Sequence, residues 1–256
     1  MTDRIQPHRI VLVLIGIGLV VLAGVTMRWD WLPDYWQLLA AGIGKTLMIL
    51  ASTVIIGFLF AVPLGLFQVT GPWPLAMLSK GFCTIIRGTP LLLQLWLLYY
   101  GLGSLFPQIP GIHDSVFWPY LRQAWPYAVL ALSMSFAGYE GEVMRGAFAG
   151  VPGGELEAAR AYGMKPLTVL WRIWLPRAMH RALPTLNGEV VLQLKSTPLV
   201  ATITVIDVYA VISKVRQETY VVYEAMLLLA LIYLCLTGIL VVAFRYFENK
   251  IPTREA

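Results

Sequence analysis

Residues Glu155–Pro176 read ELEAARAYGMKPLTVLWRIWLP, a charged, alanine-containing segment in a chain built mostly of long apolar runs. Of the 256 residues, 58% are hydrophobic and 13% are charged. Soluble domains carry roughly 25% charged residues. A helix crosses the hydrocarbon core of a bilayer with roughly 20 apolar residues. The composition therefore indicates a membrane protein, in which Glu155–Pro176 is expected to lie outside the lipid.

The apolar runs predict an all-α polytopic membrane protein with six transmembrane helices. The first run is longer than a signal-peptide core, although basic residues precede it, so we expect a retained anchor rather than a cleaved signal. A proline inside the second run is tolerated where neighbouring helices satisfy the freed carbonyl. The expected spans are Ile10–Met27, Thr46–Thr70, Leu91–Phe106, a run starting at Trp125–Phe136 and continuing through Glu140 and Glu142, Val190–Ile212 and Val221–Phe244.

Lysine and arginine gather in alternate connections between these runs. Cytoplasmic segments of membrane proteins are enriched in both residues. With the N-terminus inside, thirteen of them fall on the cytoplasmic side and five on the outer side, while Lys195 lies within a span. We therefore expect both termini in the cytoplasm. The formal charge of +5 is then a topology signal, and no nucleic-acid partner is expected.

The chain carries little material for catalysis or metal binding. Gly44-Lys45-Thr46 resembles the end of a phosphate-binding loop, but Leu39 stands where the first glycine is needed. The triplet is expected to start a helix at the membrane interface. Cys83 and Cys235 have no metal-ligand spacing, and the chain has 3 histidines. We expect no catalytic residue, no metal site and no cofactor bound by this chain.

The segment from Glu155 is predicted to start with a short helix. Val151–Gly154 reads VPGG and breaks the preceding helix, while Glu155 and Glu157 suit the positive end of a helix dipole. Gly163 suits the left-handed residue that closes a helix.

A second helix is predicted to start at Pro166, where a missing N–H costs nothing, and to end at Pro176. Its apolar stripe is expected to lie against the membrane domain: Leu167, Leu170, Trp171, Trp174 and Leu175. From the residues alone, the two helices form either an ordinary interfacial connection or a docking surface whose alanines let another protein approach closely.

Several motifs resemble the permeases of ABC importers. Glu157-Ala158-Ala159, Gly163 and Ile173-Trp174-Leu175-Pro176 match the EAA loop of that family at every fixed position and spacing. Arg87–Gln94, RGTPLLLQ, looks like the RGTPLLVQ segment of the polar amino-acid branch. Lys195–Leu199, KSTPL, resembles its KDTSL segment, with Ser196 and Pro198 departing. Gly42–Gly65 is similar to the start of the family's core domain.

The resemblance covers roughly residues 40–246 and implies a five-helix type I importer core there. Residues 1–39 would then hold an extra transmembrane helix, residues 150–183 the coupling loop and residues 247–256 a cytoplasmic tail. The implied location is the bacterial inner membrane. The implied partners are a cytoplasmic ATPase dimer that uses ATP and Mg, a second permease chain (homologous or identical) and an external substrate-binding protein. The residues implied to couple to the ATPase are Glu157, Ala158, Ala159, Gly163, Ile173, Leu175 and Pro176.

Polar residues within the expected spans are candidates for the substrate pathway, because charges inside a membrane usually face a protein interior or a cavity. Glu142 has an alternative as the ion-pair partner of Arg145, three residues on, and Glu189 has one as a solvated helix cap. Three carboxylates favour a substrate with a cationic group, such as arginine, ornithine, histidine or an opine. The alternative seat of selectivity is the external binding protein. The candidate set is Glu140, Glu142, Glu189, Lys195, Ser196 and Thr197.

Two other functions compete with an ATP-driven importer. An ion- or proton-driven secondary transporter of amino acids often has paired repeats with broken helices, and the sequence shows no such repeat. A membrane scaffold without a pathway would leave the charges within the spans unexplained. Aromatic residues of the outer loop Pro107–Trp125 are expected to form an interfacial belt, with contact to the binding protein as the alternative.

Overall fold

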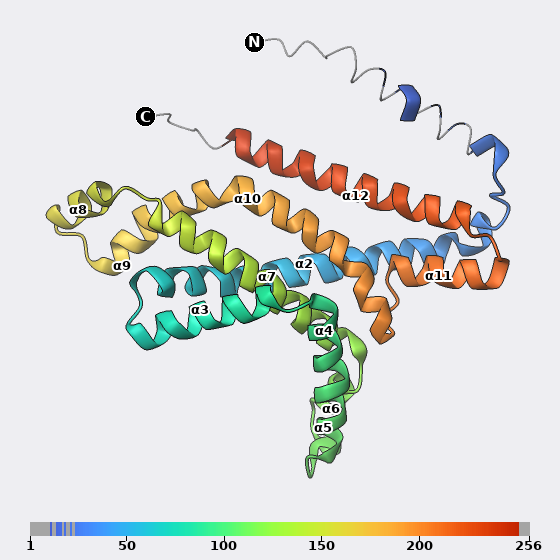
Figure 1. The fold of residues 1–256 in the computed structure, drawn as a ribbon, viewed down its shortest axis with the longest axis horizontal. Helices are drawn as coiled ribbons and strands as arrows, with labels where there is room; N and C mark the ends of the chain where they lie inside the picture. The colour runs from blue at the N-terminus through green and yellow to red at the C-terminus, as the bar shows by residue number, and fades with distance from the viewer. Residues whose placement is uncertain (1–10, 12–13, 17, 19–20, 22–23, 251–256) are drawn as a thin grey trace.

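The computed structural model describes residues 11, 14–16, 18, 21 and 24–250, which form helices joined by short connections (Figure 1). The expected first span, Ile10–Met27, falls largely outside the described residues, as do residues 251–256 of the expected tail. The longer α-helices are α2 (Leu32–Thr70), α3 (Trp73–Gly88), α7 (Ala124–Ala149), α8 (Gly153–Ala161), α10 (Leu175–Ser196), α11 (Val208–Thr219) and α12 (Tyr223–Lys250). The shorter elements are α4 (Leu91–Trp96), a π-helix (Leu97–Leu102), α5 (Gly103–Leu105), 3-10 turns at Phe106–Gln108 and Ile112–Asp114, α6 (Trp118–Leu121), α9 (Pro166–Val169), a second π-helix (Leu170–Trp174) and a 3-10 helix (Thr197–Ile203).

The helices α2 and α7 pack against each other along the centre of the molecule. Small residues at helical spacing on α2, Gly57, Ala61 and Gly65, are buried in this contact. A Cβ at Gly65 would lie 2.6 Å from the Cβ of Met144 and 2.7 Å from the backbone nitrogen of Arg145. Small residues at every fourth position let two membrane helices touch at their backbones. This contact fixes α7, which carries Glu140 and Glu142, relative to α2.

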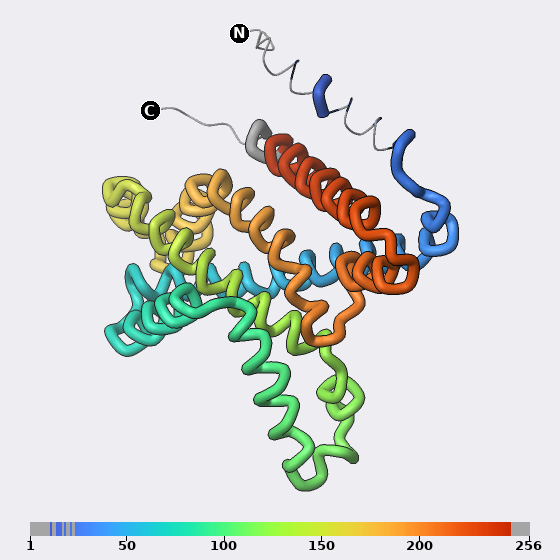
Figure 2. Tube along the Cα trace, turned by 45° about the vertical axis from the view of Figure 1, so that its right-hand side comes forward, coloured from blue at the N-terminus to red at the C-terminus, as the bar shows by residue number. Residues whose placement is uncertain are grey.

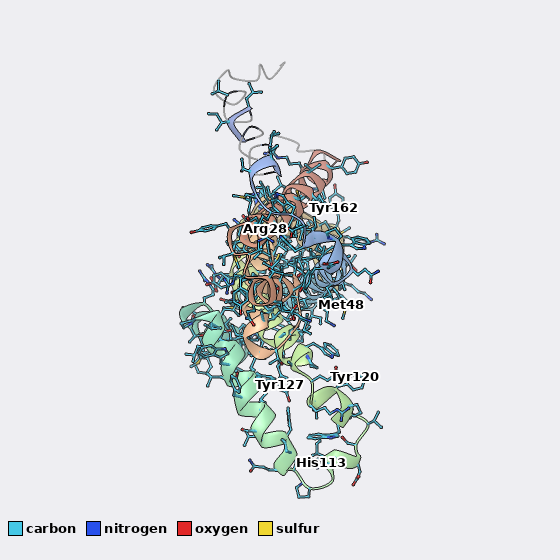
Figure 3. The ribbon with its side chains drawn as sticks, turned by 90° about the vertical axis from the view of Figure 1, so that its right-hand side faces the viewer. Arg28, Met48, His113, Tyr120, Tyr127 and Tyr162 are labelled. Carbon is cyan, nitrogen blue, oxygen red and sulfur yellow. The ribbon has the colours of Figure 1, made fainter. Side chains whose placement is uncertain are left out.

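The other helices surround this pair. In Figures 1 and 2, α10 runs beside α7, α12 lies along α10 and α11, and α3 returns along α2. The segment from α4 to α6 leaves the bundle as a separate arm, and Figure 3 shows His113 at its far end. The imidazole of His113 lies 4.2 Å, centroid to centroid, from the indole of Trp118. Phe117 and Tyr120 of the same arm are exposed.

Two single helices are long and apolar enough to cross a membrane: Leu32–Thr70 and Tyr223–Tyr246. Two bent pairs also qualify if each is one span: Trp73–Gly88 with Leu91–Gln108, bent by 105°, and Pro166–Ile203 with Val208–Thr219, bent by 54°. The 26-residue α7 is long enough to cross a membrane, but it is not among these candidates because it contains many polar and small residues. The described residues therefore contain up to four candidate spans by composition. The total of six remains a prediction.

Two details of the expected helix pattern are wrong, and one helix was not predicted. The second span starts at Leu32 with Pro33 in its first turn, so Gly44-Lys45-Thr46 lies inside a helix rather than at its start. The connection between the second and third spans contains α3. The expected span Val190–Ile212 is broken, because the 3-10 helix ends with Thr204 in the left-handed region at φ 70°. The carboxylate of Asp207 then starts α11 by accepting a hydrogen bond from the backbone N–H of Ala210 at 2.8 Å.

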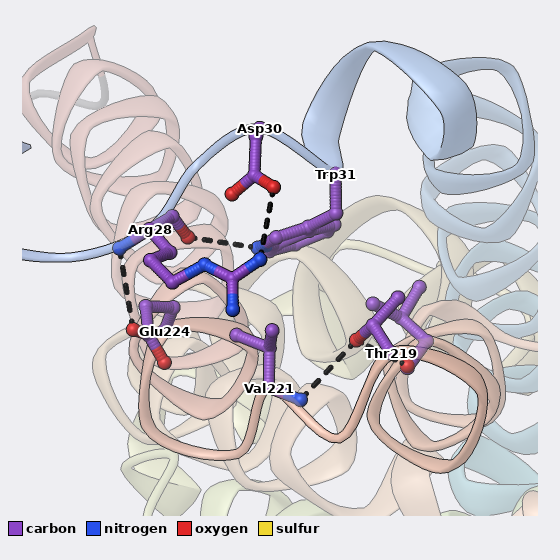
Figure 4. A network of polar contacts seen from close by, with 7 residues as sticks. Arg28, Asp30, Trp31, Thr219, Val221 and Glu224 are labelled. Atoms are coloured by element: carbon purple, nitrogen blue, oxygen red, sulfur yellow. Dashed lines mark hydrogen bonds and ion pairs between the residues drawn. The ribbon is translucent and has the colours of Figure 1, made fainter.

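A polar cluster ties the segment before α2 to the start of α12 (Figure 4). The backbone N–H of Arg28 donates to Glu224 at 3.3 Å, and the Trp31 indole N–H donates to the carbonyl of Arg28 at 3.1 Å. The Arg28 guanidinium lies 3.1 Å from Asp30 and holds the pKa of that carboxyl below its usual range. Beside it, the N–H of Val221 donates to the Thr219 hydroxyl at 3.3 Å. The cluster holds the chain against the α11–α12 corner just before α2 begins.

Candidate coupling loop and substrate pathway

The first helix of the candidate coupling loop, α8, is closed by Gly163. Gly163 has φ +78°, the left-handed conformation that glycine adopts without strain. Its N–H donates to the carbonyl of Arg160 at 2.9 Å, and the N–H of Met164 donates to the carbonyl of Ala159 at 3.2 Å. These two bonds are the paired bonds of a Schellman motif. The predicted helix end at Gly163 is confirmed.

The second helix starts at Pro166 as predicted, but it does not end at Pro176. The chain runs from α9 through the π-helix Leu170–Trp174 into α10, with Pro176 in the first turn of α10. A proline has no N–H to donate. It is tolerated here because the hydrogen-bond pattern changes from π to α just before it. The candidate coupling loop is therefore continuous with the helix that carries Glu189.

Trp174 attaches this continuous helix to the C-terminal end of α7. Its indole N–H donates to the carbonyl of Phe148 at 3.0 Å, and the two rings meet edge to face with centroids 5.5 Å apart. Leu170 and Leu175 pack in the same apolar cluster. Leu167 and Trp171 do not, since they are 67% and 63% exposed. Three of the five stripe residues thus face the bundle.

Four of the seven residues expected to couple to the ATPase line a cavity of about 820 Å³ between α8 and the start of α10. Ala158, Ala159, Ile173 and Pro176 line it together. Glu157 is exposed beside them, whereas Leu175 points into the apolar cluster under the loop. The cavity lining also includes residues that the sequence did not single out: Glu155, Tyr162, Met164, Arg172, Arg177 and His180.

An ion pair holds α8 against α10 across this cavity. The Nε of Arg177 lies 2.9 Å from a carboxylate oxygen of Glu155. Both side chains are partly solvated, so the pair is a minor contribution to stability. This pair could not be predicted from the sequence, because it joins two helices whose relative direction depends on Gly163.

Glu142 makes the ion pair predicted from its spacing. Its carboxylate lies 3.0 Å from the Nε of Arg145 and 3.7 Å from a guanidinium nitrogen of Arg87 at the end of α3. The three side chains line a cleft of about 710 Å³. The rest of the lining comes from α2 and α3: Gln68, Trp73, Ala76, Met77, Lys80 and Thr84.

Glu189 and Ser196 share a smaller cavity of about 230 Å³ between α7 and α10. Glu189 lies within α10, so it is not a helix cap. The polar side of this cavity also includes Thr89, Ser135, Tyr139 and Gln193. Of these, Gln193 was missed by the sequence analysis, and its amide donates to the Thr53 hydroxyl at 3.1 Å and the Leu132 carbonyl at 3.0 Å.

The remaining candidates of the pathway lie apart from this cavity lining. Glu140 is fully buried, and neither of its carboxylate oxygens has a hydrogen-bond partner among the described residues. Thr197 is buried as well, where its hydroxyl bonds to the Leu194 carbonyl at 2.8 Å and to the Tyr233 hydroxyl at 3.0 Å. Lys195 is exposed. Glu189 and Ser196 thus line one cavity, whereas Glu140, Lys195 and Thr197 are not part of its lining.

Known proteins similar to this chain are transport permeases. The octopine transport system permease protein OccM of Rhizobium meliloti is 38% identical over 210 residues, which cover 82% of this chain and 84% of OccM. The histidine/lysine/arginine/ornithine transport system permease protein HisM of Salmonella typhimurium is 34% identical over 226 residues, covering 86% of this chain and 95% of HisM.

Solved structures give the same result. A crystal structure of an amino acid ABC transporter with histidines matches with a TM-score of 0.74 and 27% identity, covering 89% of this chain and all of the other. An inward-facing MetNI methionine ABC transporter matches with a TM-score of 0.67 and 18% identity, which shows a shared fold alone.

Family membership follows from the extent of the match. Residues 53–252 match the family described as the inner membrane component of binding-protein-dependent transport systems. This match agrees with the EAA-loop resemblance, and it replaces the alternatives of a secondary transporter and a scaffold. The chain belongs to this family of ABC importer permeases, as a transport subunit that is not itself an ATPase.

Proposed function

We propose that this chain moves polar amino acids or opines with a cationic group inward across the membrane, driven by ATP. Relatives named for octopine, nopaline, arginine and histidine/lysine/arginine/ornithine transport support this substrate class. The cavity with Glu189 supports it from the chemistry, because a carboxylate among hydroxyl and amide groups suits a guanidinium or ammonium group.

The proposed assembly has four kinds of component around this chain. A cytoplasmic ATPase dimer would use ATP and Mg, and a second permease chain (identical or homologous) would complete the pathway. An external binding protein would deliver the substrate, and the bilayer would be a bacterial inner membrane with both termini of this chain on the cytoplasmic side. Residues 40–246 would form the five-helix core, with a sixth helix before it and a short tail after it.

The observation that carries the proposed coupling is the form of α8. A nine-residue helix with an exposed carboxylate, Glu157, and an alanine surface is held at a fixed angle by Gly163. The helix has few packing contacts of its own, so a groove on the ATPase could enclose it. Because the coupling loop is continuous with α10, a push on α8 would reach Glu189 through one helix. Closure of the ATPases would in this way produce a rigid-body transition of the permease.

The experiment that tests coupling compares ATPase binding and uptake in the assembled transporter. Glu157→Lys or Gly163→Asp is expected to abolish transport while the protein remains in the membrane. Asp114→Lys, on the arm, is the matched control for adding a lysine in place of an exposed carboxylate, and it should leave ATPase binding intact. Normal uptake with normal ATPase association in both coupling variants would refute the docking role.

The substrate class needs a separate comparison of cationic and neutral cargo. Glu140→Gln or Glu189→Gln is expected to reduce uptake of arginine more than uptake of glutamine, because each removes a carboxyl group that could pair with a cationic cargo and keeps nearly the same shape. Equal losses for the two amino acids would count against a cationic pathway.

A further inference from the structure

Arg87 lines the 710 Å³ cleft beside α7 and lies next to a residue that lines the 230 Å³ cavity. Its side chain lines the 710 Å³ cleft together with Glu142, Lys80 and Arg145. Its guanidinium carbon also lies 5.7 Å from the centroid of the Tyr139 ring, and Tyr139 lines the 230 Å³ cavity that contains Glu189. The guanidinium therefore lines the cleft and meets the cavity lining at Tyr139, and this place is called the boundary below.

Arg87 is held at this boundary by the sharp bend between α3 and α4. The two helices meet at 105°, and Arg87 occupies the last turn of α3, where the helix dipole favours a cation. Gln94 of α4 holds the bend by hydrogen bonds to the end of α3 and to Thr89. Its amide nitrogen lies 2.8 Å from the carbonyl of Ile86, 3.0 Å from the carbonyl of Thr89 and 2.7 Å from the Thr89 hydroxyl.

Neutralising Glu142 does not by itself account for Arg87, because a second arginine already pairs with that carboxylate. Arg145 already pairs with Glu142 at 3.0 Å, closer than Arg87 at 3.7 Å. No cation in the described part of the chain pairs with Glu189 within 4.0 Å. A guanidinium that stacks on a tyrosine beside a carboxylate-lined cavity has the same chemistry as the cationic group of an arginine-like cargo.

We propose that Arg87 is a resident cation that closes the cleft-side end of the Glu189 cavity and selects cationic cargo. Cargo would leave the cavity by displacing the Arg87 guanidinium from Tyr139 and Glu142, an exchange that a cationic group makes and a neutral isostere does not. This inference rests on the proposed function, since it assigns the cavity to the transport pathway and the cleft to its cytoplasmic side.

The test measures access to the cavity without relying on transport. Ser196→Cys places a thiol in the cavity lining, and Cys235→Ser removes the exposed native thiol. The complete transporter in inside-out vesicles is then treated with a charged, membrane-impermeant thiol reagent. Adding Arg87→Ala should speed labelling about five- to thirtyfold, because it removes an ion pair and a cation–π contact.

Two further variants separate this role from a general loosening of the fold. Lys80→Ala removes a cation from the same cleft but not from the boundary. Labelling should therefore keep the rate measured for Ser196→Cys with Arg87 and Lys80 unaltered. Arg87→Lys retains the charge and should keep labelling within about threefold of that rate. Unchanged labelling in an assembled Arg87→Ala transporter, or equal acceleration by Lys80→Ala, would overturn the proposal.

Protection by cargo tests the selective part. Arginine should slow labelling of Ser196→Cys, while its neutral isostere citrulline should do so only when Arg87 is replaced by alanine. Equal protection by both compounds with Arg87 present would overturn this part. Arginine uptake by the unaltered transporter is measured in parallel, and its absence would refute the proposed substrate class without changing the access result.

Discussion

Replacing Gly163 tests whether the ATPase recognises a preformed bend after α8. Gly163 has φ +78°, and a Cβ added there would meet nothing within 4 Å. The cost of Gly163→Ala is therefore backbone strain alone, about 1–2 kcal/mol for an L-residue in the left-handed region. The nine-residue α8 is too short to be stable by itself, so it cannot absorb this strain without losing its angle to α10.

Because about 1.4 kcal/mol corresponds to a tenfold change in an equilibrium constant, the strain predicts an affinity for the ATPase that is about five- to thirtyfold weaker. Gly163→Asn should lose less, since asparagine tolerates the left-handed region, and Gly163→Val should lose more. The assay is a titration of the purified ATPase against the permease in nanodiscs, followed by substrate uptake at saturating ATPase.

Gly154→Ala is the matched control. Gly154 lies in the first turn of α8, has no positive φ and would also give a Cβ open space. The Gly154→Ala variant should bind the ATPase with the affinity of the unaltered chain. An affinity of Gly163→Ala equal to that of the unaltered chain would refute the argument, and so would an asparagine variant as weak as the valine variant.

Three further predictions concern the frame around the site. Gly65→Ala should lower the stability of the permease by about 1–3 kcal/mol, because its Cβ would lie 2.6 Å from the Cβ of Met144. The control is Gly44→Ala, whose Cβ would have nothing within 4 Å, and equal Tm values for the two variants would contradict the prediction. Gln94→Leu removes the amide that donates hydrogen bonds to the end of α3, so it should loosen the 105° bend between α3 and α4. Spin labels on α3 and α5 should then give a broader distance distribution, and an unchanged distribution would contradict the prediction. Arg28 lowers the pKa of Asp30, so the contribution of this pair is present above about pH 4 and is lost as the pH falls through the lowered pKa. Hydrogen-exchange protection at residues 28–31, taken relative to the intrinsic exchange rate at each pH, should fall with acid in the unaltered chain, and an equal fall in Asp30→Asn would exclude this pair as the cause.

The parts of the coupling loop that the sequence predicted depend on local chemistry. Gly163 and Pro166 impose backbone geometry on their own positions, so the end of α8 and the start of α9 could be predicted from single residues. The pair of Glu142 with Arg145 follows from three-residue spacing on one helix. Such features need no knowledge of the tertiary fold.

The features that the sequence did not predict depend on contacts between distant residues. Pro176 is tolerated inside a long helix because a π-helical turn precedes it, and the anchoring of Trp174 to Phe148 helps to hold that turn. The break before α11 is stabilised in the same way, since the N–H of Val208 donates to the hydroxyl of Thr46 on α2 at 3.2 Å. A hydropathy pattern contains neither partner, so the sequence predicted a helix end at Pro176 and an unbroken span over Val190–Ile212.

The structure also gives different surroundings to the three carboxylates that the sequence analysis named as pathway candidates. Glu142 has two arginine partners, Glu189 faces a cavity, and Glu140 is enclosed without a partner. An isolated charge in such surroundings is costly unless a proton or another cation neutralises it. Glu142 therefore already has cationic partners within the chain, whereas Glu189 has none within 4.0 Å among the described residues and, under the proposed function, would receive the positive charge of a cargo. Among the three, Glu189 is the carboxylate whose position fits direct contact with substrate, and Arg87 is the side chain that a departing cargo would have to displace.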